Sequence, residues 1–203
     1  MAQITAADVK KLRELTDAPM MACKKALEDA DGDLQKAADL VRERTGAKMD
    51  ARAGERTAAD GAVVAYMHAP NPDLPAKVGV LLQLHCETDF VAKGDKFQQL
   101  ARDIAMHIAA MKPLVVSEDQ VDAEMLEKEK DFARKEAAES GKPDNIVERI
   151  VEGKIKKFYE EAVLLNQPFV KDDSKTVAQL ISEVQGVTGE KIEVAKFVRF
   201  QVG

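Results

Sequence analysis

The stretch HCETDFVAK, residues 85–93, decides how the chain folds, because two hydrophobic patterns of different period meet within it. Upstream, alternate residues from Val78 to Cys86 are apolar, which is the period of a strand with one buried face. Downstream, apolar residues from Phe97 to Ile108 recur with the period of an amphipathic helix. The sequence therefore predicts a strand, a short acidic turn and a helix, in that order.

Phe90 lies between these two patterns and is needed by neither of them. A large aromatic ring at an exposed tip lowers solubility, so such a ring commonly inserts into a pocket of another molecule. The alternative is that Phe90 folds back as a hydrophobic staple beneath the start of the helix. The local pattern favours neither interpretation.

The remaining patterns predict an α+β protein in five segments. In order they are a three-helix bundle, a linker, the first part of an antiparallel-sheet α+β core, a projecting helical hairpin and the remainder of the core, at residues 1–46, 47–60, 61–116, 117–162 and 163–203. Helices and strands mix without a strict strand–helix–strand rhythm. This favours an antiparallel α+β core over a doubly wound parallel sheet.

The first segment contains helix start and stop signals for three short helices. Thr5 and Asp33 are the expected N-caps of the first and third helices, and Pro19 fits the first turn of the second. Gly46 is expected to end the third helix. A bundle of this size also fits a nucleic-acid-binding helix-turn-helix. However, nine basic against ten acidic residues up to Asp50 give a local net charge of −1, which argues against that function.

The core is expected to contain strands and one long helix. The predicted strands cover residues 62–67 and 78–86, with a proline-containing turn at residues 70–75 between them. A helix from about Asp89 to Met111 follows the second strand. Towards the C-terminus, the sequence predicts a short strand, a short helix and a final strand, at residues 163–170, 177–184 and 192–202.

The hairpin prediction rests on two apolar stripes separated by SGKP at residues 140–143. Ser117 is expected to cap the first helix, whose apolar stripe is formed by Val121, Met125, Phe132 and Ala133. The other faces of both helices are highly charged. Two helices of similar length around an apolar seam indicate an antiparallel coiled coil that projects into solvent.

Charge and composition argue against several functions. The chain has 36 acidic and 30 basic residues, and its net charge of −6 argues against broad binding to a phosphate backbone. No apolar run approaches the roughly 20 residues of a membrane span, and the N-terminus lacks a signal-peptide pattern. Two cysteines do not make a disulfide framework. We expect a cytoplasmic protein with no direct nucleic-acid or membrane contact.

Residues suited to metal binding or covalent catalysis are few. The group His85, Cys86, Glu87 and Asp89 might suggest a metal site. On a strand, Cys86 points opposite to His85 and Glu87, so they cannot share one ion without a bulge. No Gly-rich phosphate loop is present, so the chain is not itself a GTPase. We expect no metal and no cofactor, with Cys86 and Cys23 as small core residues.

Met20 and Met21 precede the apolar spacing of their helix, so both cannot easily pack inward. Adjacent methionines at a helix start suit an adaptable protein contact. The alternative is that one of them packs into the core.

Several of these segments carry a family resemblance. TDFVAK at residues 88–93 resembles the signature of elongation factor Ts, the guanine-nucleotide exchange factor of bacterial and organellar translation. LRELT at residues 12–16, followed by MMACKKAL at residues 20–27, resembles the family's other signature. Further similar segments follow in the family's order, at residues 103–110, 140–143 and 167–170. The resemblance covers nearly the whole chain.

The resemblance implies a ubiquitin-associated-like N-terminal bundle and a partner, elongation factor Tu, which is a GTPase. It implies a wedge that disturbs the partner's magnesium and phosphate site and so releases GDP, together with separate contacts to the GTPase domain. The residues carried over are Thr88, Asp89, Phe90 and Val91 for the wedge and Arg13, Met20, Met21 and His68 for the other contacts.

The chain has one core segment where longer family members have two. A homodimer, or a 2:2 complex with the GTPase, is therefore a hypothesis that light scattering tests. Two other functions fit parts of the sequence. A non-catalytic helical adaptor predicts that Phe90 is dispensable, and a thiol enzyme using Cys86 predicts that alkylation abolishes activity. Neither explains five separated motif similarities in order.

Overall fold

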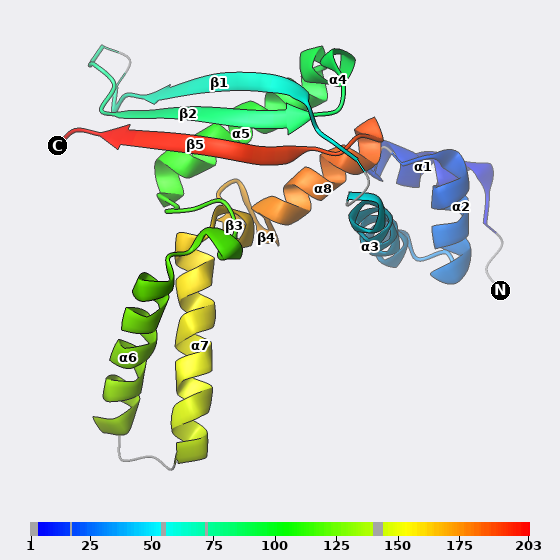
Figure 1. Cartoon of the computed structure of the whole chain (residues 1–203). Coiled ribbons are helices and arrows are strands. Elements are labelled where there is room, and N and C mark those ends of the chain that lie inside the picture. The colour runs from blue at the N-terminus through cyan, green and yellow to red at the C-terminus, as the bar shows by residue number, and fades with distance from the viewer. Residues whose placement is uncertain (1–3, 17, 54–55, 72, 140–143) are drawn as a thin grey trace. The chain divides into compact units, whose positions relative to one another are not determined.

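The computed structural model describes residues 4–16, 18–53, 56–71, 73–139 and 144–203, and these form an α+β protein (Figure 1). The helices are α1 (Ala6–Thr16), α2 (Met20–Asp29), α3 (Leu34–Ala53), α4 (Asp89–Lys93), α5 (Asp95–Met111), α6 (Ala123–Glu139), α7 (Asp144–Ala162) and α8 (Val177–Thr188). The strands are β1 (Asp60–His68), β2 (Val78–Cys86), β3 (Pro168–Phe169), β4 (Asp172–Thr176) and β5 (Glu193–Gln201). Two short 3₁₀ helices, η1 and η2, cover Glu118–Gln120 and Leu164–Asn166.

The described residues group into two compact units. The first unit comprises Met1–Ala62, His85–Leu100 and Gln179–Glu193, and the second comprises Val63–Leu84, Ala101–Ala178 and Val194–Gly203. Several elements, including β2 and α5, contribute to both units. A chain that crosses repeatedly between units in this way brings distant segments of sequence together within each of them.

Helices α1, α2 and α3 pack around a common apolar core in which Leu12, Cys23 and Leu27 are fully buried. The predicted cap of α1 is confirmed. The N–H of Asp8 donates to Thr5 Oγ1 at 3.3 Å, while the N–H and hydroxyl of Thr5 donate to Asp8 Oδ2 at 3.0 and 2.7 Å. Each residue therefore satisfies a donor of the other, as in a capping box.

The third helix begins as predicted but does not end as predicted. Asp33 Oδ1 accepts the N–H groups of Gln35 and Lys36, both at 3.0 Å, so the predicted N-cap is confirmed. The prediction that Gly46 ends this helix is wrong, because α3 continues to Ala53. One interior glycine costs only about 1 kcal/mol relative to alanine. Strong helix formers dominate residues 47–53 and offset that cost.

The three long strands form an antiparallel sheet in the order β1-β2-β5, with β2 in the centre (Figure 1). The predicted alternation along β2 is confirmed. Val80, Leu82 and Leu84 are buried, whereas Leu81 between them is exposed. Two hydrogen bonds from the Arg199 guanidinium to the carbonyl of Ala109, at 3.0 and 3.2 Å, tie β5 to the end of α5.

The predicted continuous helix from Asp89 to Met111 is wrong, because Gly94 divides it into α4 and α5. The backbone of Gly94 is extended, with ψ 143°, and its N–H donates to the carbonyl of Val91 at 2.9 Å. The carbonyl of Ala92, freed by this break, accepts the side-chain amide of Gln98 at 2.6 Å. The break leaves α4 as a single short turn of helix ahead of the core helix.

Helices α6 and α7 lie side by side within the second unit (Figure 1). The prediction that Ser117 caps the first of them is wrong, because Ser117 makes no capping hydrogen bond and precedes η1. Asp122 is the cap instead, since its Oδ1 accepts the N–H of Met125 at 3.0 Å. The predicted turn at residues 140–143 lies outside the described residues.

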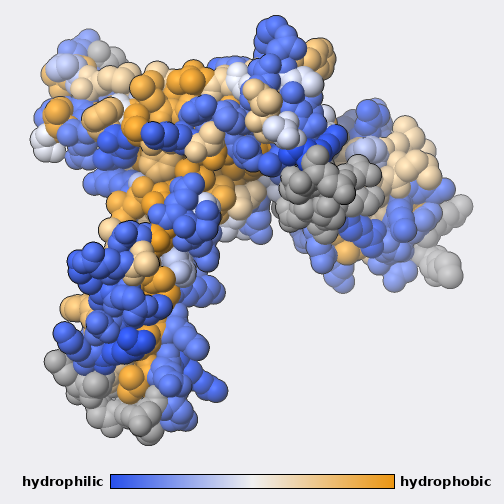
Figure 2. All heavy atoms as spheres, viewed as in Figure 1, coloured by the Kyte–Doolittle hydropathy of each residue, from blue (hydrophilic) through white to orange (hydrophobic). Residues whose placement is uncertain are grey.

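The predicted apolar stripe of α6 is confirmed at Ala133 but wrong at Phe132 and Met125. Ala133 and Ala137 are buried, whereas Phe132 and Met125 are 65% and 41% exposed. Adjacent helical residues project about 100° apart, so a face centred on the two alanines turns Phe132 outward. Figure 2 shows hydrophilic residues around a narrow hydrophobic stripe between the two helices.

The segment after α7 is mostly not the strand that its apolar residues predict. Residues 164–166 form η2, and only Pro168–Phe169 is a strand, paired antiparallel with β4. Gln167 accounts for this, because its side chain is buried and donates to the carbonyl of Glu161 at 2.6 Å. A buried amide of this kind fixes a compact turn rather than an extended strand.

His107 on α5 forms the other half of this buried polar pair. Its Nδ1 accepts the N–H of Val170 at 3.2 Å, and its Nε2 lies 2.9 Å from Gln167 Oε1. A neutral ring with its proton on Nε2 satisfies both contacts. Burial lowers the pKa of His107 below its ordinary value, and the hydrogen bond to Gln167 opposes part of this effect.

We expect the melting temperature to decrease as the pH is lowered from 7 to 5.5. Because the folded-state pKa of His107 lies below its unfolded-state value, the unfolded chain binds the proton first. Stability is then lost as pH falls below about 6.5, by at most about 1.4 kcal/mol per pH unit. Thermal melts of a His107→Gln variant should show a shallower dependence over this range. Equal slopes in the parent and the variant would contradict the assignment.

Candidate functional site

The turn between β2 and α5 presents a single exposed aromatic ring. Phe90 is 83% exposed, although Cys86 before it and Val91 after it are buried. The staple alternative is therefore wrong, since a ring folded beneath the helix would be covered. The chain leaves the core at Cys86 and re-enters it at Val91, so only residues 87–90 are available to form the tip.

Thr88 begins the helix that carries this ring. It is the N-cap of α4, with extended backbone, and its Oγ1 accepts the N–H of Val91 at 3.4 Å. Asp89 follows in the first turn, where its charge complements the helix dipole. Lys93 Nζ donates to Asp89 Oδ2 at 2.6 Å. This hydrogen bond and the lysine's charge hold the pKa of Asp89 below its ordinary value and raise that of Lys93.

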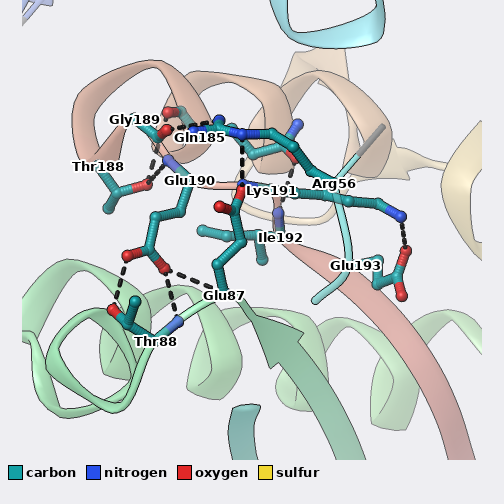
Figure 3. A network of polar contacts seen from close by, with 10 residues as sticks. All are labelled: Arg56, Glu87, Thr88, Gln185, Thr188, Gly189, Glu190, Lys191, Ile192 and Glu193. Atoms are coloured by element: carbon teal, nitrogen blue, oxygen red, sulfur yellow. Dashed lines mark hydrogen bonds and ion pairs between the residues drawn. The ribbon is translucent and has the colours of Figure 1, made fainter. Parts of the chain in front are cut away.

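A carboxylate from a distant part of the sequence holds the base of the tip (Figure 3). Glu190, just after α8, accepts three hydrogen bonds. Its Oε2 receives the N–H groups of Glu87 and Thr88, both at 3.1 Å, and its Oε1 receives the Thr88 hydroxyl at 2.6 Å. The two N–H groups precede the helix and would otherwise have to find other acceptors.

The contact is reciprocal, because Glu87 holds the segment that carries Glu190. Glu87 Oε1 accepts the N–H of Lys191 at 2.6 Å and also pairs with Arg56 Nε at 3.3 Å. Arg56 Nη1 in turn donates to the carbonyl of Gly189 at 2.8 Å. We call these residues, Arg56, Glu87, Thr88 and Glu190, the carboxylate clamp (Figure 3).

The turn that carries Glu190 is itself held by side chains of α8. The N–H of Ile192 donates to Gln185 Oε1 at 2.8 Å, and the N–H of Glu190 donates to Thr188 Oγ1 at 3.4 Å. Sequence reasoning missed Glu190 and Arg56. No local pattern marks them, since Glu190 lies more than 100 positions from the residues that it binds.

The predicted contacts on the N-terminal bundle are also exposed. Met20 and Met21 are 60% and 74% exposed in the first turn of α2, and Arg13 is exposed on α1. Neither methionine packs inward, so the alternative of a buried methionine is wrong. His68 is exposed at the end of β1, where its Nδ1 lies 3.3 Å from the hydroxyl of Tyr66.

The described residues offer little for metal or thiol chemistry. Among them, no group of three or more histidine, cysteine or carboxylate side chains could hold a metal ion. Cys86 is buried, and its thiol donates to the carbonyl of Thr88 at 3.2 Å. Burial and the Glu190 carboxylate raise the pKa of Cys86, whereas reactive cysteines have a lowered one. The described helices include none long and apolar enough to cross a membrane.

Known proteins resemble this chain over its whole length. The family model described as Elongation factor TS matches residues 1–203. A relative named Elongation factor Ts from Desulforamulus reducens is 50% identical over 203 residues, which are the whole chain and 91% of the relative. Proteins of the same name from Frankia alni and Oleidesulfovibrio alaskensis are 50% and 47% identical. The alignments cover the whole chain and 98% and 100% of those relatives.

The described residues form an α+β protein with an exposed aromatic tip and a three-helix bundle. The matches identify the class as translation elongation factors. The chain belongs to the elongation factor Ts family.

Replacing Thr88 with valine should destabilise the protein by about 1–2 kcal/mol. The variant keeps the size of the side chain but loses the helix cap and the hydroxyl donated to Glu190. Urea unfolding measures this loss. The matched variant Ser117→Ala removes a hydroxyl that makes no capping bond and should change stability by less than about 0.5 kcal/mol. Equal losses in both variants would show that Thr88 is not an important cap.

Proposed function

We propose that this protein is a guanine-nucleotide exchange factor that binds elongation factor Tu and promotes release of its GDP. The observation that carries the proposal is the 83% exposed ring of Phe90 on a tip whose two ends are buried in the core. Such a ring is costly to expose to water, and central aromatic residues dominate the energy of many protein interfaces. Family membership supports the choice of partner.

Exchange of this kind needs no covalent chemistry and makes the protein a binding factor rather than an enzyme. The factor accelerates release by preferring the nucleotide-poor conformation of the GTPase. By reciprocity, it weakens nucleotide binding by the same factor by which nucleotide weakens its own binding. Equal affinity for both conformations would have no effect. The contacts made only with the nucleotide-poor state therefore determine the activity.

Phe90 and Asp89 form the wedge in this proposal. They insert beside the magnesium and phosphate site of the GTPase and disturb the ion that neutralises the phosphates, which loosens GDP. Thr88 sets the start of the helix that presents them. Val91 supports the wedge from within, because its side chain is buried and its N–H is bonded to Thr88.

A second group of contacts holds the GTPase domain while the wedge acts. Met20 and Met21 offer flexible apolar side chains, and Arg13 offers a cation, all on the exposed surface of the bundle. His68 provides a further contact. Separate holding and wedging contacts let the factor remain bound while one part of its partner moves.

The finer description of the architecture is also part of the proposal. The bundle is ubiquitin-associated-like, the hairpin of α6 and α7 is an antiparallel coiled coil, and the domain limits are those expected from the sequence, at residues 1–46, 47–60, 61–116, 117–162 and 163–203. The protein acts in the cytoplasm, without direct nucleic-acid or membrane contacts, and as a homodimer or in a 2:2 complex. Light scattering of the protein alone and with its partner tests the assembly.

The Phe90→Ala variant should lose most of its ability to accelerate GDP release. Truncating a central interface aromatic costs about 2 kcal/mol or more, which is roughly 30-fold in rate. Stopped-flow release of a fluorescent GDP from elongation factor Tu, at saturating factor, measures this directly. The urea midpoint should stay close to the parent value, because the ring makes few contacts within the protein.

Phe132→Ala is the matched control, since it removes another highly exposed phenyl ring, 65% exposed on α6. It should leave the maximal release rate unchanged. If GDP is released as fast with Phe90→Ala as with the parent, the wedge is disproved and other contacts accelerate release. If the parent itself does not accelerate release, the exchange function is disproved.

A further inference from the structure

We propose that Glu190 is a positioning residue for GDP release, which it supports by holding the backbone of the Phe90 tip rather than by touching the partner. The inference rests on the proposed function of the tip. Glu190 uses both carboxylate oxygens on groups at the base of the tip, two backbone N–H groups and one hydroxyl (Figure 3). It therefore fixes the direction in which the chain leaves β2.

The tip cannot order itself. Helix α4 has five residues, and an isolated helix of this length does not form in water because nucleation costs more than so few hydrogen bonds return. The Lys93–Asp89 ion pair within it is exposed and adds little. Order must therefore come from contacts outside the helix, and Glu190 supplies three of them through Glu87 and Thr88.

Thr88 passes this constraint on to Phe90. Its hydroxyl donates to Glu190 and accepts the N–H of Val91, so one oxygen joins the clamp to the first turn of the helix. Phe90 lies within that turn. A ring held in its binding direction before the encounter avoids an ordering cost that would otherwise weaken the complex.

Arg56 reinforces the opposite side of the clamp. Its guanidinium bridges the Glu87 carboxylate and the carbonyl of Gly189, next to Glu190 in the chain. The two carboxylates thus hold each other's backbone, and the cation joins both segments. Loosening Glu190 should consequently release the tip without removing any side chain that faces the partner.

The test uses Glu190→Gln, which keeps the size of the side chain but replaces one acceptor oxygen with an NH₂ group. The Thr88 hydroxyl can no longer donate to the side-chain position that becomes NH₂, and the backbone N–H groups of Glu87 and Thr88 lose an ionised acceptor for a neutral one, which weakens the clamp. The matched control is Glu193→Gln, which removes the same charge three residues away but breaks only an ion pair with Lys191. The maximal rate of GDP release from elongation factor Tu should fall roughly tenfold in Glu190→Gln and stay unchanged in Glu193→Gln.

A double-mutant cycle with Phe90→Ala separates positioning from general destabilisation. If Glu190 acts through Phe90, Glu190→Gln should cause no further loss of rate in the Phe90→Ala background. An equal fold-loss in both backgrounds would overturn the proposal. A full rate in Glu190→Gln with Phe90 intact would also overturn it.

Hydrogen exchange in the free protein gives a readout that does not depend on the partner. The amides of Glu87 and Thr88 should exchange roughly tenfold or more faster in Glu190→Gln, while amides of the α5 core keep the parent's rates. Unchanged exchange at both amides would overturn the clamp itself. If the exchange result holds but the parent does not accelerate GDP release, the proposed function has failed, and the positioning role falls with it.

Discussion

The short stretch of chain between two buried residues, Cys86 and Val91, determines how the tip is built. β2 must keep Cys86 in the core and the following helix must bury Val91, so the chain has four residues in which to leave the core, reverse and return. Phe90 is the last residue of this short reversal, and its ring lies in solvent. The two apolar patterns thus limit the tip to these four residues, and the same constraint creates backbone donors at its base that need acceptors.

Glu190 and Glu87 meet that need, because the carboxylate of each accepts backbone N–H groups from the segment that carries the other. Hydrogen bonds to ionised acceptors are stronger than neutral ones, so this small turn gains a rigidity that its five-residue helix lacks. Burial, together with the nearby Glu190 carboxylate, raises the pKa of the Cys86 thiol, whereas reactive cysteines have a lowered one. A rigid, chemically inert tip suits a protein that acts by mechanical displacement of a partner rather than by covalent chemistry.

The sequence predicted what depends on local period and failed where a single distant contact decides. The faces of β2 and the caps at Thr5 and Asp33 follow from nearest neighbours, and the structure agrees with them. Gly46 did not end its helix, since the propensity of the next seven residues outweighs one glycine. The predicted strand at residues 163–170 is mostly a turn, in which the buried Gln167 side chain bonds to the nearby Glu161 carbonyl and to His107, 60 positions away. Glu190 escaped prediction for the same reason, because its partners are distant in sequence and its own neighbourhood is unremarkable.

In the proposed complex, Phe90 enters the partner beside its magnesium and phosphate site. A photo-reactive benzoyl-phenylalanine placed at position 90 tests this most directly, since it reacts only with groups within a few ångströms. After irradiation with elongation factor Tu, mass spectrometry should locate the cross-link on the GTPase domain, on helices next to the magnesium ion, and excess GDP should reduce its yield. A cross-link on another domain, or a yield equal to that from a probe placed at position 132, would contradict the account.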